Sequence, residues 1–224
     1  MARFSRVEVI DAMLETGLVP VFYQGDLNKA KHIVDACLAG GARVLEFTNR
    51  GDLAYRVFCD LLEYVSRNKP EAILGVGSVI DGPTASLYIN SGANFVVGPN
   101  LNPEVARLCN RRKVSYSPGC GSVSEISNAE ELGVEIVKIF PGGLVGGPAF
   151  VQAVKGPMPW TRIMPTGGVS PTKESVDAWV KAGAACLGMG SKLIIKDLVA
   201  KEDWAGITQN VKNCLKLIDE ARAA

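Results

Sequence analysis

Strands and helices alternate along the whole chain with no long linker, and this alternation limits the possible folds more than any other feature. Short runs rich in apolar residues predict strands, and apolar residues at helical spacing predict helices. The expected strands are 18–23, 43–48, 72–78, 94–98, 114–118, 134–140, 162–166 and 185–189. The helices expected after them are 28–39, 52–67, 82–90, 103–111, 122–132, 149–155, 171–182 and 203–222, and a short helix over 5–15 is expected before the first strand.

Strict alternation of this kind predicts a parallel sheet. Eight units within 224 residues predict an α/β protein with one (β/α)8 TIM barrel, a single domain over residues 1–224 that carries an extra N-terminal helix. The competing fold is a doubly wound open sheet, which binds its nucleotide at a glycine-rich turn after the first strand. The turn found there, Gln24-Gly25-Asp26, is not such a loop, so the pattern favours the barrel.

Composition excludes several classes of protein. A net charge of +1 without a basic stripe argues against nucleic acid as a partner. The start MARFSRVEVIDAML lacks the apolar core of a secretory signal, and no apolar run approaches ~20 residues, so we expect a cytoplasmic protein without a membrane span. The six cysteines are scattered and are expected to be reduced thiols. His32 is the only histidine and is expected at the surface, so neither a histidine-based metal site nor a cofactor is expected.

One lysine interrupts an apolar strand. In the stretch VEIVKIFPGG, Lys138 lies between β-branched and aromatic residues, close to the glycines that end the strand. Burial disfavours the charged form of an amine, and a neutral amine can attack a carbonyl carbon to form a Schiff base. The alternatives are a lysine whose ammonium reaches solvent and one that pairs with a carboxylate at the strand end.

Alternation of side chains along the strands gathers further polar residues at one end of the barrel. Val44, Glu46 and Thr48 are expected to point inward, opposite to Leu45 and Phe47, because successive side chains face opposite sides of a strand. Three more polar residues follow strand ends, and they are Arg50, Ser78 and Thr166. Each has an ordinary explanation as a surface ion pair or a turn residue, but together with Lys138 at one barrel mouth they favour an active site.

The residue types suggest a division of roles. Lys138 would turn a 2-oxo acid into an iminium, which is an electron sink for cleavage of a carbon–carbon bond. Glu46 would move protons, and Arg50 would hold a carboxylate through two hydrogen bonds.

Two glycine-rich stretches late in the chain, PTGGVSP and GMGSKL, follow the last two expected strands. Barrels often bind phosphate at this place, next to the start of a short helix. The backbone N–H groups of Gly167, Gly168, Gly190 and Ser191 are therefore candidate phosphate donors, with Ser191 as a helix N-cap. The alternative is that both stretches are only tight turns.

The sequence resembles the 2-keto-3-deoxy-6-phosphogluconate / 4-hydroxy-2-oxoglutarate aldolase family. The matching stretches run in family order from about residue 17 to 193, and they are GLVPVF, GGARVLEFTNR, GVGSVI, GANFVVGPNL, SPGCGSVSE, VKIFPGGLVGGPAF, MPTGGVSP and GMGSKL. The resemblance implies a class I aldolase, usually a homotrimer, that splits a 4-hydroxy-2-oxo acid of sugar acid metabolism into pyruvate and an aldehyde. Carried over by motif, Lys138 resembles the Schiff-base lysine and Glu46 the general acid/base. The residues that would then lie on the pyruvate side are Arg50, Ser78, Thr166, Pro99 and Phe140, and the phosphate side would be Gly167, Gly168, Gly190 and Ser191.

Some positions depart from the family pattern. Tyr23 stands where many members have an arginine, and LEFTNR replaces the commoner LEVTLR, so that Asn49 is expected to add a polar group beside the site. GPN and GMGSKL are closer to the phosphogalactonate-cleaving branch, whereas PTGG is closer to the phosphogluconate branch. Two other functions remain as alternatives, a sugar-phosphate epimerase or decarboxylase on the same barrel and a non-catalytic barrel that binds sugar phosphates.

Overall fold

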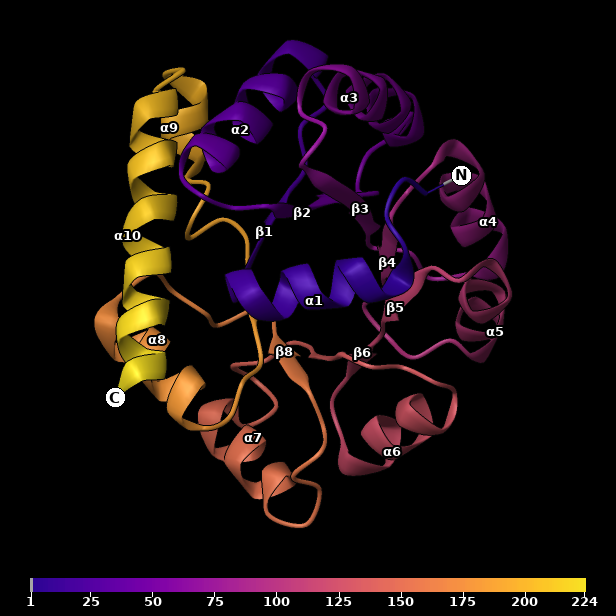
Figure 1. Ribbon diagram of the computed structural model, residues 1–224, viewed down its shortest axis with the longest axis vertical. Helices are drawn as coiled ribbons and strands as arrows, with labels where there is room; N and C mark the ends of the chain where they lie inside the picture. The colour runs from indigo at the N-terminus through magenta and orange to yellow at the C-terminus, as the bar shows by residue number, and fades with distance from the viewer. Residues whose placement is uncertain (1) are drawn as a thin grey trace.

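The computed structural model describes residues 2–224, and helices surround its parallel strands as in a (β/α)8 barrel (Figure 1). The strands are β1 (Leu18–Phe22), β2 (Val44–Thr48), β3 (Ile73–Gly77), β4 (Phe95–Val97), β5 (Ser115–Ser117), β6 (Gly119–Cys120), β7 (Val137–Ile139), β8 (Ile163–Pro165) and β9 (Leu187–Met189). The helices are α1 (Arg6–Thr16), α2 (Leu27–Ala39), α3 (Ala54–Asn68), α4 (Gly82–Ser91), α5 (Pro103–Arg112), α6 (Val123–Glu131), α7 (Gly147–Lys155), α8 (Lys173–Lys181), α9 (Lys196–Ala200) and α10 (Trp204–Ala223).

The first and last strands are neighbours, which closes the barrel. β1 pairs in parallel with β2 on one side and with β9 on the other. One run of pairs has the order β5-β4-β3-β2-β1-β9, and a second has the order β6-β7-β8. The bridges Ile163 to Ala184 and Thr166 to Gly188 join the second run to the first. The predicted barrel and its extra N-terminal helix are confirmed.

Pro118, the last residue of the fifth expected strand, separates β5 from a further short strand, β6. Proline has no N–H to donate to a ladder, and here the pairing changes from β4 on one side to β7 on the other. The carbonyl of Pro118 accepts the N–H of Lys138 at 3.0 Å, and Gly119 is the register partner of Lys138. The expected strand over 114–118 is therefore present as β5, whereas β6 beyond it was not predicted, and the break between the two lies beside the lysine.

Helix α1 crosses one end of the barrel (Figure 1). Its N-terminus carries a capping box between Ser5 and Glu8, and Gly17 ends it with φ +70°, a left-handed conformation that suits glycine. The helix packs on the first residues of several strands, so it covers the amino-terminal end of the barrel. The inner cluster that it completes contains Val9, Ile10, Ala12, Met13, Val19, Val44, Ile73, Phe95, Val97, Ile136, Met164 and Cys186.

A larger apolar layer lies between the strands and the surrounding helices. Leu45, Phe47, Val137 and Ile139 belong to this outer layer, whereas Val44 and Ile136 belong to the inner cluster. The predicted alternation of side chains on β2 is therefore confirmed, and β7 alternates in the same way. It places polar residues of the inward set at the carboxyl end of the barrel, opposite to α1.

Four smaller observations complete the fold. The short helix expected after the last strand is present as the five-residue α9, but it begins at Lys196. His32 is exposed, as expected, and its ring stacks on Trp204 of α10 with centroids 5.0 Å apart. All six cysteines are free, and no helix within residues 2–224 is both long enough and apolar enough to cross a membrane.

Candidate active site

Lys138 is buried on β7, near the carboxyl end of the barrel. Its side chain is 5% exposed, and its Nζ lies 5.0 Å from the ring centroid of Phe140. Lys138 forms no ion pair with any residue in 2–224, so neither an exposed ammonium nor a structural salt bridge explains it. Burial lowers the pKa of Lys138; nearby Glu46 opposes this shift and Arg50 adds to it. A larger fraction of free amine at neutral pH is what a nucleophilic lysine needs.

Glu46 is the second buried charge of the barrel interior. It is 1% exposed on β2, and its Oε2 has no hydrogen-bond partner. A Cβ at Gly77 of β3 would overlap its carboxylate, so glycine at that position makes room for the Glu46 side chain. Burial raises the pKa of Glu46, while Lys138 and Arg50 partly counteract the rise. A buried carboxyl group with one unpartnered oxygen and a raised pKa is suited to proton transfer.

Arg50 and Ser78 contact each other where their strands end. Arg50 follows β2 and is exposed to the cavity described below, and its Nε donates to Ser78 Oγ at 3.3 Å. Ser78 follows β3 with φ +61°, which is uncommon for a residue other than glycine. Arg50 makes no ion pair with Glu46, so the alternative that these two residues form a surface ion pair is excluded.

Thr166 lies across the barrel mouth from Arg50. It follows β8, is 8% exposed, and its Oγ1 has no hydrogen-bond partner. A Cβ at Gly188 would overlap this hydroxyl, so β9 carries glycine where Thr166 approaches it. Pro99 lies near Lys138, since the Pro99 carbonyl packs against Gly119, the register partner of Lys138.

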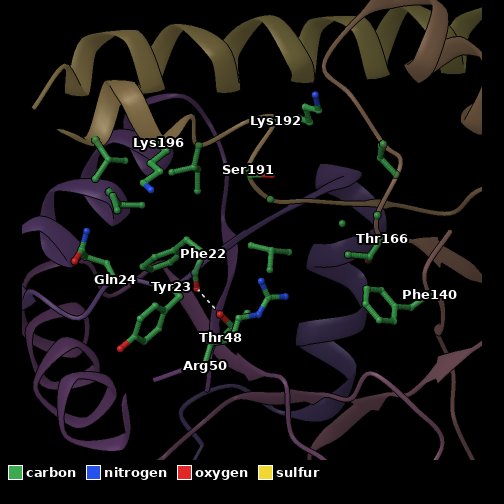
Figure 2. A pocket seen from close by; sticks show the side chains of 18 of the residues that line it. Phe22, Tyr23, Gln24, Thr48, Arg50, Phe140, Thr166, Ser191, Lys192 and Lys196 are labelled. Carbon is green, nitrogen blue, oxygen red and sulfur yellow. Dashed lines mark hydrogen bonds between the residues drawn. The ribbon is translucent and has the colours of Figure 1, made fainter. Parts of the chain in front are cut away.

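A cavity of about 560 Å³ opens at the carboxyl end of the barrel (Figure 2). Of the residues expected at the site, it is lined by Arg50, Phe140, Thr166, Gly167, Gly168, Gly190 and Ser191. Thr48, which was expected to point inward, and Tyr23, at the position of the family's arginine, also line it. Residues that line it but were not expected there are Val21, Phe22, Gln24, Ile33, Val169, Gly188, Lys192, Ile194, Lys196 and Val199. Lys138, Glu46, Ser78 and Pro99 do not line the cavity itself. Lys138 is buried behind its wall, with Nζ 5.0 Å from the ring centroid of the lining residue Phe140.

Two expectations about this region were wrong. Ser191 is not a helix N-cap: it lies in a turn closed by hydrogen bonds from Leu193 and Ile194 to the carbonyl of Gly190, and α9 begins only at Lys196. Asn49 does not add a polar group to the cavity, because its Oδ1 accepts a hydrogen bond from Tyr88 of α4 at 2.8 Å. Asn49 shares the outward parity of Phe47, a signal that was available in the sequence.

The fold and this group of side chains define a class of protein: a barrel enzyme with a buried amine and a buried carboxyl group at its mouth. The comparisons with known proteins agree. The sequence model of the family "KDPG and KHG aldolase" matches residues 9–210. The chain therefore belongs to the 2-keto-3-deoxy-6-phosphogluconate / 4-hydroxy-2-oxoglutarate aldolase family. It is a class I aldolase, a carbon–carbon lyase.

Relatives support this assignment over nearly the whole chain. A KHG/KDPG aldolase of Escherichia coli is 31% identical, with 92% of this chain and 94% of the relative covered. A 2-dehydro-3-deoxy-phosphogluconate aldolase of Pseudomonas aeruginosa is 34% identical, with 85% and 84% covered. The solved KDPG aldolase of Legionella pneumophila, which holds pyruvate as a covalent carbinolamine, superimposes with a TM-score of 0.83 at 26% identity and covers 94% of this chain and 98% of its own.

The buried carboxyl group has a consequence for stability. At a pH between the ordinary pKa of a glutamic acid and the raised pKa of Glu46, the folded chain holds a proton that the unfolded chain has lost. Stability therefore falls as the pH rises through this window. We expect Glu46→Gln to be more stable than the wild type at pH 8 and to lose most of that advantage at pH 4, as measured by chemical denaturation. Glu71→Gln, at an exposed carboxylate, is the control and should show no such dependence; an equal gain at both pH values for Glu46→Gln would contradict the prediction.

Proposed function

We propose that Lys138 and Glu46 are the catalytic residues and that the substrate is 2-keto-3-deoxy-6-phosphogluconate or a related 4-hydroxy-2-oxo acid. Related substrates are the 6-phosphogalactonate epimer and 4-hydroxy-2-oxoglutarate. The products would be pyruvate and an aldehyde, either glyceraldehyde 3-phosphate or glyoxylate. One observation carries the proposal: a buried amine with a lowered pKa and a buried carboxyl group with an unpartnered oxygen share one barrel end.

The reaction would begin with attack of Lys138 Nζ on the C2 carbonyl of the substrate. Loss of water from the resulting carbinolamine gives an iminium. Glu46 then removes the proton of the C4 hydroxyl, the C3–C4 bond breaks, and the electron pair moves into the iminium to give an enamine. After the aldehyde leaves, protonation of the enamine at C3 and hydrolysis release pyruvate and restore Lys138.

Other residues would hold the substrate in place. The guanidinium of Arg50, oriented by Ser78, would pair with the C1 carboxylate. The unpartnered hydroxyl of Thr166 would donate a hydrogen bond to the same end of the substrate. Phe140 and Pro99 would limit the space around C3, since one faces the Lys138 amine and the other packs beside its strand.

The direct test is reduction with borohydride in the presence of pyruvate, followed by peptide mapping. A reduced pyruvate adduct on Lys138 is expected. An adduct on another lysine, or no adduct, would overturn the assignment of Lys138.

We propose that the phosphate of a phosphorylated substrate lies at the backbone N–H groups of Gly167, Gly168, Gly190 and Ser191. All four residues line the cavity. A carboxylate in this place would repel a phosphate, so Ser191→Asp should raise KM for 2-keto-3-deoxy-6-phosphogluconate by about tenfold or more. For 4-hydroxy-2-oxoglutarate KM should change little, as should exchange of the pyruvate methyl protons with deuterated water. Equal losses with both aldol substrates would mean general damage to the barrel mouth, and no loss with either would mean that the glycines are only turns.

We also propose that the chain works as a homotrimer in the cytoplasm, in sugar acid degradation of the Entner–Doudoroff type. The family resemblance supports this proposal, and so do exposed apolar side chains in loops at the barrel mouth, among them Leu53, Ile80 and Leu144. Light scattering should give about three times the chain mass of 23.8 kDa.

A further inference from the structure

The proposed phosphate donors carry no formal charge. Backbone N–H groups can orient a phosphate, but its charge still has to be balanced by a cation or a helix dipole. Since Ser191 lies in a turn and does not start a helix, the chain offers no helix dipole at that residue. A cation from another part of the cavity is therefore needed.

The charges that line the cavity are all positive. Arg50, Lys192 and Lys196 line it together with no aspartate or glutamate, although the whole chain has a net charge of only +1. In the proposed function Arg50 is occupied by the C1 carboxylate. Lys192, just before α9, and Lys196, at the start of α9, are therefore left to bind a second anion at the other end of the substrate.

These two lysines are oriented differently (Figure 2). The amine of Lys192 points toward α10, away from Arg50, whereas that of Lys196 points from α9 toward Phe22 and Gln24 at the cavity wall. Lys196 is exposed and forms no ion pair with any residue in 2–224, so its charge is available to a ligand. Apolar side chains of the same wall, Ile33 and Val199, leave little else there to attract an anion.

We infer that Lys196 is a specificity-determining residue whose ammonium pairs with the terminal phosphate of the substrate. The inference rests on the proposed function, in which Lys138 holds the other end of the same molecule. Lys196 contributes binding of the intact phosphorylated substrate and takes no part in imine formation or proton transfer.

The test compares Lys196→Met with Lys192→Met on three six-carbon 2-oxo acids that differ only in their terminal group, which is a phosphate, a carboxylate or a hydroxymethyl group. Lys196→Met should raise KM for the phosphorylated acid about 10- to 100-fold, the range for a charge-assisted hydrogen bond, with kcat nearly unchanged. KM of Lys196→Met for the hydroxymethyl acid should stay within about twofold of the wild-type value. A rise in KM confined to the carboxylate acid would overturn the phosphate assignment. Lys196→Arg should restore most of the binding of the phosphorylated acid, whereas Lys192→Met should have little effect.

The outcomes separate this inference from the proposed function. Trapping of pyruvate on Lys138 should be the same in the wild type and in Lys196→Met. If the wild type traps no pyruvate, the proposed function fails. If it traps pyruvate normally but Lys196→Met affects all three acids equally, or Lys192→Met has the same effect as Lys196→Met, the aldolase assignment stands and the inference about Lys196 is wrong.

Discussion

Replacing Lys138 with methionine is expected to abolish cleavage, with a loss of about 10⁴-fold or more, the scale on which enzymes lose activity without their nucleophile. Methionine fills a similar volume beside Phe140 but has no amine, so no iminium can form and the C3–C4 bond has no electron sink. The measurement is the rate of pyruvate release from 2-keto-3-deoxy-6-phosphogluconate. Because the fold buries the Lys138 amine, the methionine variant should remain folded.

Two controls belong to this experiment. Borohydride should leave the methionine variant unlabelled by pyruvate, while the wild type is labelled. EDTA should leave wild-type activity unchanged, because the protonated imine serves as the electron sink and no Lewis acid is required. Labelling of the variant, or loss of wild-type activity with the chelator, would contradict the Schiff-base assignment.

Glu46→Gln should separate imine formation from proton transfer. Glutamine keeps the shape of the side chain against Gly77 but cannot take up a proton, and a general base typically contributes about 10²–10⁴-fold. Exchange of the pyruvate methyl protons with deuterated water, followed by NMR, should slow by this factor. Borohydride should still trap pyruvate on Lys138. Exchange at the wild-type rate would show that another group moves the proton.

Much of the site could be predicted because it depends on alternation along strands. The apolar residues next to Glu46 and Lys138 along their strands indicate which side of each strand faces the barrel interior, and the structure follows that pattern. The residues after the strands could be predicted as well, since parallel strands end at the same edge. Arg50, Thr166 and the four candidate phosphate donors accordingly line the cavity.

The parts that could not be predicted depend on contacts between distant segments. The sequence contains Pro118 but does not say that the strand ladder changes partner there. Ser191 has the residue type of an N-cap, but Gly190 closes a turn around it and α9 begins five residues later. Lys196 reaches the cavity only because that short helix packs against α10 next to the barrel mouth, and nothing in its local sequence indicates this position.

The helix that crosses the amino-terminal end of the barrel also determines the route by which the products depart. With Val9 and Met13 of α1 fully buried in the inner cluster, that end is closed, and the cavity at the carboxyl end is the route to solvent. Both products must therefore leave through the opening of this cavity. In the proposed mechanism the aldehyde, which has no covalent bond to the protein, leaves first, and pyruvate follows once its bond to Lys138 is hydrolysed. Pyruvate is then the product that meets the empty enzyme, so it should compete directly with the substrate, while the aldehyde should inhibit in a different, non-competitive manner.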